Sequence, residues 1–249
     1  LADETHGVRR VVIEKPFGRD TESCRALLDT LKDQGWKEND LYRIDHYLGK
    51  EMVQNIIPLR TQNPWLRAIW NKDVVRSVHI VFKEPFGTEG RGGYFDEYGI
   101  VRDILQNHLL QILTLIAMEL PDKLTAHTIR DAKVRVLKSM DRIRVQDCLL
   151  GQYDGYTNDD TISNKDTTTP TYACIRTRVH SWGNVPLVLE AGKALDEGLC
   201  EARLHLGHNN ALVLRLQPTP AIFFTASLKT VGFSEHSTVS HLGLSYTQH

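Results

Sequence analysis

Apolar and polar positions near the start of the chain follow the order strand, helix, strand. A β-branched run at residues 10–14 stops before Pro16 and predicts a strand. Asp20 is a good N-cap for apolar positions that recur at helical spacing until Gly35, which supplies a stop. A second apolar alternation ends at Ile44. This order predicts the last part of a parallel α/β unit.

The central part of the chain predicts further helices and one strand. Apolar residues at helical spacing follow Lys50, and residues 74–82 alternate as a strand with one apolar face. Residues 100–120 give the longest helical pattern, with a broad apolar stripe, and residues 131–140 give another.

The C-terminal half predicts short strands separated by polar turns, with a polar loop at residues 156–169. The strands are expected at residues 148–150, 171–179, 185–189, 203–206 and 211–216. Residues 234–249 are polar and weakly patterned, and no role is assigned to them. We therefore expect an α+β fold with a large, mainly antiparallel sheet packed against helices.

Composition and charge narrow the class of protein. The net charge of −1 argues against nucleic acid as a partner, because no basic excess is available to displace counterions. The four cysteines form no C-x-x-C pair, so neither a zinc site nor a disulfide framework is expected, and a reducing compartment fits best. The most apolar stretch, residues 109–118, is too short to span a bilayer, and the start of the chain does not resemble a signal peptide.

A dense polar cluster lies between the strand that ends at Ile44 and the helix after Lys50. It contains an acid, an imidazole, a phenol and an ammonium: Asp45, His46, Tyr47 and Lys50. In open α/β sheets ligands bind at such corners, so we interpret the cluster as a site. A solvated loop before a helix is the alternative.

Residues 45–51, Asp-His-Tyr-Leu-Gly-Lys-Glu, resemble the signature of the glucose-6-phosphate dehydrogenase family. The resemblance extends to Glu-Lys-Pro-Phe-Gly at residues 14–18, and to residues 82–95 and 102–108, which follow in the family's order. It covers about residues 9–217. The chain is thus identified as a member of this family, lacking most of the N-terminal coenzyme domain and the C-terminal end.

The resemblance implies two domains. Residues 1–45 would be the C-terminal remnant of a Rossmann-like NADP-binding domain, and residues 46–249 an α+β domain for substrate binding and oligomerisation. No strand runs into a G-x-G-x-x-G turn and a helix. The glycines at positions 87, 90, 92 and 93 have the wrong spacing for a phosphate-cradling turn, so we expect a flexible connection there, with a cradle as the alternative.

The resemblance implies NADP-dependent oxidation of D-glucose 6-phosphate to 6-phospho-D-glucono-1,5-lactone, the first step of the oxidative pentose phosphate pathway. His108 would be the general base and Asp45 the carboxylate paired with its other ring nitrogen. Histidine suits this role because its ordinary pKa is about 6.5. Asp103 lies five positions before His108, about 140° around an α-helix, so we do not expect these two residues to face one another.

The family's substrate-binding positions fall on residues spread along the whole chain. They are Lys15, His46, Tyr47, Lys50, Glu84, Asp103, Lys193 and Gln217, and Lys15 would also face the nucleotide. Carboxylates suit sugar hydroxyls, and donor groups suit phosphate. Glu190 and Leu199 stand where members from animals have basic residues, so we do not expect the additional structural NADP site of those members.

Two other readings remain. The isolated chain could be a non-catalytic fragment of the enzyme that binds substrate and oligomerises. A metal hydrolase built on His46, Glu84 and His108 is disfavoured because no metal-ligand spacing is present, and no metal is expected. The expected partners are glucose 6-phosphate, NADP and further copies of the chain in a homodimer or homotetramer, with neither nucleic acid nor membrane, in the cytoplasm.

Overall fold

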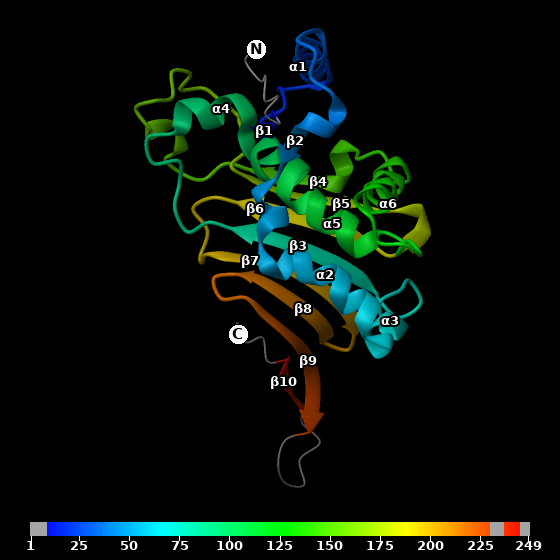
Figure 1. The fold of residues 1–249 in the computed structure, drawn as a ribbon. Helices are drawn as coiled ribbons and strands as arrows, with labels where there is room; N and C mark the ends of the chain where they lie inside the picture. Colours follow the sequence, from blue (N-terminus) through cyan, green and yellow to red (C-terminus); the bar gives the residue numbers. More distant parts are fainter. Residues whose placement is uncertain (1–8, 230–236, 245–249) are drawn as a thin grey trace, which may run out of the picture. The chain divides into compact units, whose positions relative to one another are not determined.

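The computed structural model describes residues 9–229 and 237–244. The chain divides into two compact units, residues 1–49 and residues 50–249. The division falls a few residues after the domain boundary expected from the sequence. The elements of both units are labelled in Figure 1.

The first unit is the expected strand, helix and strand. Its strands β1 (Val11–Glu14) and β2 (Leu41–Ile44) pair in parallel, joined by α1 (Thr21–Asp33) and a short turn, η1 (Glu38–Asp40). The Asp20 carboxylate accepts the Ser23 N–H at 2.8 Å and completes a capping box, which confirms the predicted N-cap.

Apolar side chains of this unit are unusually exposed. Val12 is 64% exposed, Tyr42 43% and Ile44 37%, and no residue of α1 is buried. Parallel strands normally have both faces covered, so the two-stranded sheet presents apolar surface that such sheets usually bury.

The second unit begins with helices. After η2 (His46–Gly49), which ends the first unit, come α2 (Glu51–Gln62) and α3 (Pro64–Ile69). α2 confirms the helix predicted after Lys50, and its residues Met52, Val53 and Ile56 are buried. The short helix α3 was not predicted.

The second unit is organised around an eight-stranded sheet in the order β10-β9-β8-β7-β3-β6-β5-β4. The strands are β3 (Ser77–Lys83), β4 (Cys148–Gly151), β5 (Tyr172–Thr177), β6 (Leu187–Gly192), β7 (Leu199–Gly207), β8 (Asn210–Gln217), β9 (Ala221–Lys229) and β10 (Ser237–Leu244). Among the described strands of this sheet only β3 and β6 pair in parallel, so the mainly antiparallel sheet is confirmed. Figure 1 shows α2, α3 and α5 against one side of this sheet.

Two strand predictions need correction. β3 starts at Ser77, because Val74 belongs to a turn in which its N–H donates to the Asn71 side chain at 3.2 Å. The strands β9 and β10 were not predicted. β10 lies inside the weakly patterned segment 234–249, whose remaining residues lie outside the described part of the chain.

The single helix predicted over residues 100–120 is instead two consecutive pieces, the π-helical segment η3 (Val101–Leu109) and α5 (Leu110–Ala117). They follow α4 (Gly92–Ile100), which was not predicted and has a kink at Gly99, whose φ is 66°. α6 (Ala126–Lys138) starts earlier than expected, because Thr125 forms a capping box with Thr128. Shorter turns are η4 (Val145–Asp147), η5 (Tyr156–Asn158) and η6 (His180–Trp182). None of the described helices is both long and apolar enough to cross a membrane.

The C-terminal end of α5 is buried, and its carbonyl groups are satisfied by side chains. The Arg60 guanidinium donates to the Leu115 and Met118 carbonyls, both at 2.6 Å. The indole N–H of Trp70 donates to the Ile116 carbonyl at 3.0 Å, and that of Trp182 donates to the Ala117 carbonyl at 2.9 Å. These contacts replace the water that a helix end otherwise needs.

The glycine-rich connection before α4 is hydrogen-bonded to the loop at residues 153–162, so it is not the flexible connection expected from the sequence. The Asp159 carboxylate accepts the N–H groups of Gly90 at 3.0 Å and Gly92 at 3.2 Å, and the Thr88 hydroxyl at 2.8 Å. A Cβ on Gly92 would lie 2.7 Å from the Asp159 side chain, so the close approach requires glycine. Because a carboxylate of the same chain occupies these amides, the phosphate-cradle alternative is wrong.

Candidate active site

Two of the predicted residues of the first unit directly follow its parallel strands. Lys15 follows β1 and forms a cis peptide bond with Pro16, and Asp45 follows β2. Both therefore lie at the carboxyl edge of the parallel pair, where ligands bind in open α/β sheets.

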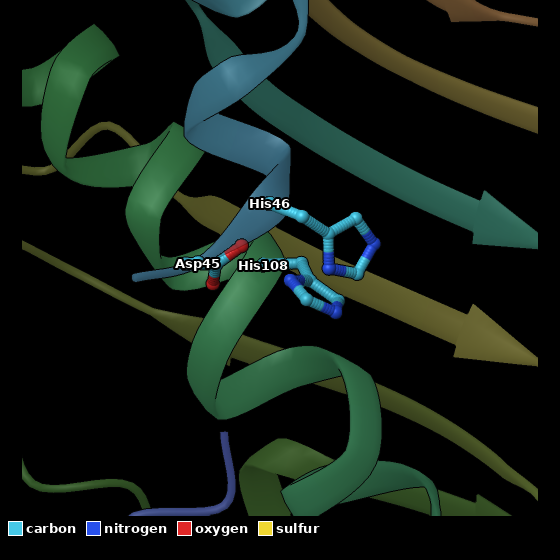
Figure 2. A group of neighbouring side chains, drawn as sticks. All are labelled: Asp45, His46 and His108. Atoms are coloured by element: carbon cyan, nitrogen blue, oxygen red, sulfur yellow. The ribbon is translucent and has the colours of Figure 1, made fainter. Parts of the chain in front are cut away.

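His46 and Tyr47 start η2, immediately after Asp45; Figure 2 shows Asp45 and His46. The Asp45 carboxylate accepts the Tyr47 N–H at 2.9 Å, which fixes the start of this turn. His46 Nδ1 lies 3.0 Å from Glu14 Oε1, at the end of β1. Glu14 was not singled out as a site residue, although it belongs to the Glu-Lys-Pro-Phe-Gly motif.

In the second unit, Glu84 and Lys193 lie at one edge of the sheet. They directly follow β3 and β6, which run parallel, so their side chains come together. Lys193 Nζ donates to Glu84 Oε2 at 2.5 Å, and both side chains are largely buried. The backbone locks the pair, because the Glu84 N–H donates to the Gly192 carbonyl and the Leu195 N–H to the Glu84 carbonyl.

An aromatic ring accompanies this ion pair. The Lys193 ammonium lies 5.3 Å from the centre of the Phe95 ring, on α4. A cation over an aromatic face is stabilised by the ring quadrupole, most strongly where water is excluded. Phe95 was missed, because α4 itself was not predicted.

Gln217 and Lys50 lie near the same edge of the sheet. Gln217 ends β8 and pairs with Cys200 of β7, whose other neighbour is Phe82 of β3. Burial raises the pKa of the Cys200 thiol to about 12, and the positive charge of Lys50 at the start of α2 opposes this rise. The edge therefore collects Lys50, Glu84, Lys193 and Gln217.

Asp103 and His108 lie on η3, which packs against β3 and β6. His108, shown on this segment in Figure 2, is 2% exposed. A π-helix bonds residue i to residue i+5, so positions 103 and 108 are one turn apart and lie on the same side. The expectation that the two residues do not face one another assumed α-helical geometry, which this segment does not have.

Asn107 stabilises the π-helical turn from within. Its side-chain NH₂ donates to the Asp103 carbonyl at 2.9 Å, and its side-chain oxygen accepts the His108 N–H at 2.8 Å. This bridge satisfies backbone groups between the two predicted site residues.

A second group of charges lies on strands β3, β6, β7 and β8. The Glu190 carboxylate lies 2.7 Å from His79 Nε2 and accepts the Tyr172 hydroxyl at 3.1 Å; the bond from His79 lowers the pKa of Glu190. Buried Glu201 pairs with Arg203 and Arg215, at 2.6 and 3.2 Å.

Comparison with known proteins gives the same family for both parts of the chain. Residues 57–249 match the model of the glucose-6-phosphate dehydrogenase C-terminal domain, and residues 1–55 that of the NAD binding domain of the same enzyme. The first supports the α+β sheet domain, and the second indicates a nicotinamide dinucleotide as cofactor.

Individual relatives agree with the domain models. The cytoplasmic glucose-6-phosphate 1-dehydrogenase 6 of Arabidopsis thaliana is 47% identical over 97% of this chain and 49% of its own length. The Saccharomyces cerevisiae glucose-6-phosphate 1-dehydrogenase is 47% identical over 97% of this chain and 51% of its own length. A solved structure of glucose-6-phosphate dehydrogenase in complex with its substrate glucose-6-phosphate superimposes with a TM-score of 0.87 and 44% identity, covering 98% of this chain and 54% of that one.

The chain thus spans about half the length of the curated relatives it matches. Its sheet domain, the strand-helix-strand unit and the ordered motifs all agree with the two domain models. The chain belongs to the glucose-6-phosphate dehydrogenase family.

Proposed function

We propose that the protein containing this chain oxidises D-glucose 6-phosphate at C1 to 6-phospho-D-glucono-1,5-lactone, with NADP as the oxidant. The observation that carries the proposal is the sheet edge at which Lys50, Glu84, Lys193 and Gln217 gather, beside the π-helical segment with Asp103 and His108. Cations and carboxylates in one place suit a ligand that has both a phosphate and several hydroxyls.

In this proposal His108 takes the proton of the C1 hydroxyl. Asp45 pairs with its other ring nitrogen, which fixes the tautomer and stabilises the imidazolium formed on proton transfer. The π-helical turn makes Asp103 a second candidate for this carboxylate.

A double-mutant cycle with Asp45→Asn and His108→Asn in the longer protein decides between the two carboxylates. If Asp45 and His108 act as one unit, the double variant loses little more turnover than His108→Asn alone. If the two losses multiply, the Asp45 assignment fails, and Asp103→Asn enters the same cycle.

The remaining predicted residues bind the substrate. His46, Tyr47 and Lys50 offer an imidazole, a phenol and an ammonium to the phosphate. Glu84 and Asp103 accept sugar hydroxyls, while Lys193 holds Glu84 in place and Gln217 adds an amide from the end of β8. Lys15 faces both the sugar phosphate and the nucleotide.

The first unit has some of the features of a dinucleotide-binding site. Lys15 lies at the carboxyl edge of a parallel strand pair, where dinucleotides bind in such folds. The glycine-rich turn that usually holds the pyrophosphate is not found in the sequence. When bound, the nicotinamide accepts a hydride from C1 of the sugar.

The test is turnover of the longer protein with glucose 6-phosphate, followed by the absorbance of the reduced nicotinamide, with NADP and NAD compared in parallel. Reduction of NADP that is lost in His108→Asn supports the proposal. A preference for NAD would contradict the assignment of NADP as the cofactor. The same assay on residues 1–249 tests the alternative that the chain alone binds substrate without turnover. Activity above that of its own His108→Asn control would exclude this alternative.

We further propose that the protein acts in the cytoplasm as a homodimer or homotetramer. The compartment follows the named cytoplasmic relative, and the assembly follows the resemblance to the family. Light scattering after size-exclusion chromatography measures the second point, and a monomeric mass for the longer protein would contradict it.

A further inference from the structure

A cleft of about 360 Å³ lies where the segment between α6 and β4 runs beside β5. Met140 forms an antiparallel bridge with Val179, and the Asp141 N–H donates to the Arg178 carbonyl at 2.9 Å. Four arginines line the cleft, two from each segment: Arg142, Arg144, Arg176 and Arg178.

The lining has an excess of positive charge. Its carboxylates are Asp141 and Asp147, so four guanidinium groups face two carboxylates, which leaves two positive charges in a chain whose net charge is −1. Arg176 pairs with Asp147 at 3.0 Å, and Asp141 lies 3.6 Å from His180. The guanidinium groups of Arg142, Arg144 and Arg178 form no ion pair with any carboxylate in the described part of the chain.

The backbone that carries these arginines is fixed. The Asp147 N–H donates to the Arg144 carbonyl at 2.9 Å, which closes η4, and the Cys148 thiol contacts the same carbonyl at 3.4 Å. Arg176 belongs to β5, which pairs with both β4 and β6. Like charges held close together on a fixed backbone repel one another, and a bound anion relieves this repulsion.

The cleft is distinct from the candidate active site. β5 runs antiparallel to β6, and its last residue, Thr177, pairs with Leu187, the first residue of β6. Arg176 and Arg178 therefore lie at the end of the strands opposite to Lys193. A ligand in the cleft therefore binds apart from the substrate of the proposed reaction.

Guanidinium groups favour one class of ligand. Their planar forks match the oxygens of phosphate in pairs, and an exposed guanidinium avoids the cost of burying a charge. The volume is in the range of small-molecule sites. We propose that this cleft binds a small anion with at least two phosphate groups, through Arg142, Arg144 and Arg178.

The test is calorimetric titration of the 249-residue chain with pyrophosphate, with chloride holding the ionic strength constant. It is carried out in a Lys50→Ala background, so that the proposed sugar phosphate site does not contribute. We expect saturable binding of one pyrophosphate per chain. Arg144→Gln/Arg178→Gln should weaken binding by about tenfold or more, and Arg142→Gln alone by less.

The matched control is Arg130→Gln/Arg135→Gln, which removes the same charge from exposed positions of α6. Its affinity should equal that of the background. Equal weakening in both double variants would mean diffuse attraction and would overturn the proposal, as would the absence of saturation. Titration with orthophosphate should give binding at least about tenfold weaker, and equal affinity for both anions would contradict the requirement for two phosphate groups.

Discussion

The contact between the Lys193 ammonium and the Glu84 carboxylate determines what either residue can do alone. Both have lost most of their solvent, and each offsets the charge of the other. Removing one partner leaves a largely buried charge unpaired, which is more costly than losing the contact itself. Kinetic effects of single substitutions here therefore include the response of the remaining partner.

Substitutions at the two ends of the proposed substrate site should affect different kinetic constants. Lys50→Ala in the longer protein is expected to raise the Michaelis constant for glucose 6-phosphate by about tenfold or more, because it removes the proposed charge-assisted contact to phosphate. His108→Asn is expected mainly to lower turnover, because it removes the proposed base. Steady-state kinetics at saturating NADP measures both, and a loss of turnover confined to Lys50→Ala would reverse the assignment.

Glu190 should make stability depend on pH. The bond from His79 lowers its pKa below the ordinary value of 4.5, so the ionised carboxylate favours the folded state. This contribution is fully present above that ordinary value and is lost as the pH falls through the lower folded pKa.

In Glu190→Gln, thermal unfolding temperatures should therefore decline less steeply with acidification over that range. Glu119→Gln, at an exposed position, is the matched control. The same acid-side slope in Glu190→Gln and in the unsubstituted chain would refute the stabilising role of the carboxylate.

At the scale of elements, the buried end of α5 depends on side chains from two other parts of the chain. The Arg60 guanidinium remains charged near neutrality, although burial lowers its pKa to about 10. We expect Arg60→Ala to lower the free energy of unfolding by about 3 kcal/mol, because two buried carbonyls lose a charged donor. Denaturant unfolding measures the change.

Arg67→Ala, an exposed arginine on α3, should change stability far less. If both variants lose the same free energy, the carbonyl contacts are not the source of the effect.

The Asp159 carboxylate should control the local order of the glycine-rich connection. Its bonds to Thr161 and Thr88 lower its pKa well below the ordinary range, so it is ionised at neutral pH. Asp159→Ala removes the acceptor for the Gly90 and Gly92 amides, and their hydrogen exchange should accelerate markedly. Asp160→Ala is the neighbouring control and should leave these amides protected.

The sequence predicts those helices and strands whose signals lie within the element itself. Asp20 and the apolar spacing define α1, and the ordered family motifs identify the residues that gather at the sheet edge. The π-helical turn could not be predicted, because its apolar residues recur at a spacing that also fits an α-helix. The longer i to i+5 turn is stabilised by side-chain contacts such as that of Asn107 with the Asp103 carbonyl, which the sequence pattern does not show. α4 was missed because its glycines suggested a loop, whereas Gly92 is required by the approach of Asp159 and Gly93 by the approach of Thr161.

For the whole molecule, the charges on β3, β6, β7 and β8 predict the number of nucleotides bound. Glu190 is already paired with His79, and Arg203 and Arg215 share the single carboxylate of Glu201. A carboxylate near a nucleotide phosphate repels it. Calorimetry of the longer protein should therefore show one NADP per subunit, and two per subunit would contradict this prediction.

The exposed strands β1 and β2 have a consequence for the behaviour of the chain in solution. Two parallel strands with exposed apolar side chains, whose outer edges pair with no other strand in the described part of the chain, are a template for strands of other molecules. At high concentration the isolated 249-residue chain should self-associate through this unit. A separate polypeptide that pairs with these two strands should suppress the association, so the same strands that promote aggregation would also serve as a docking point for such a partner.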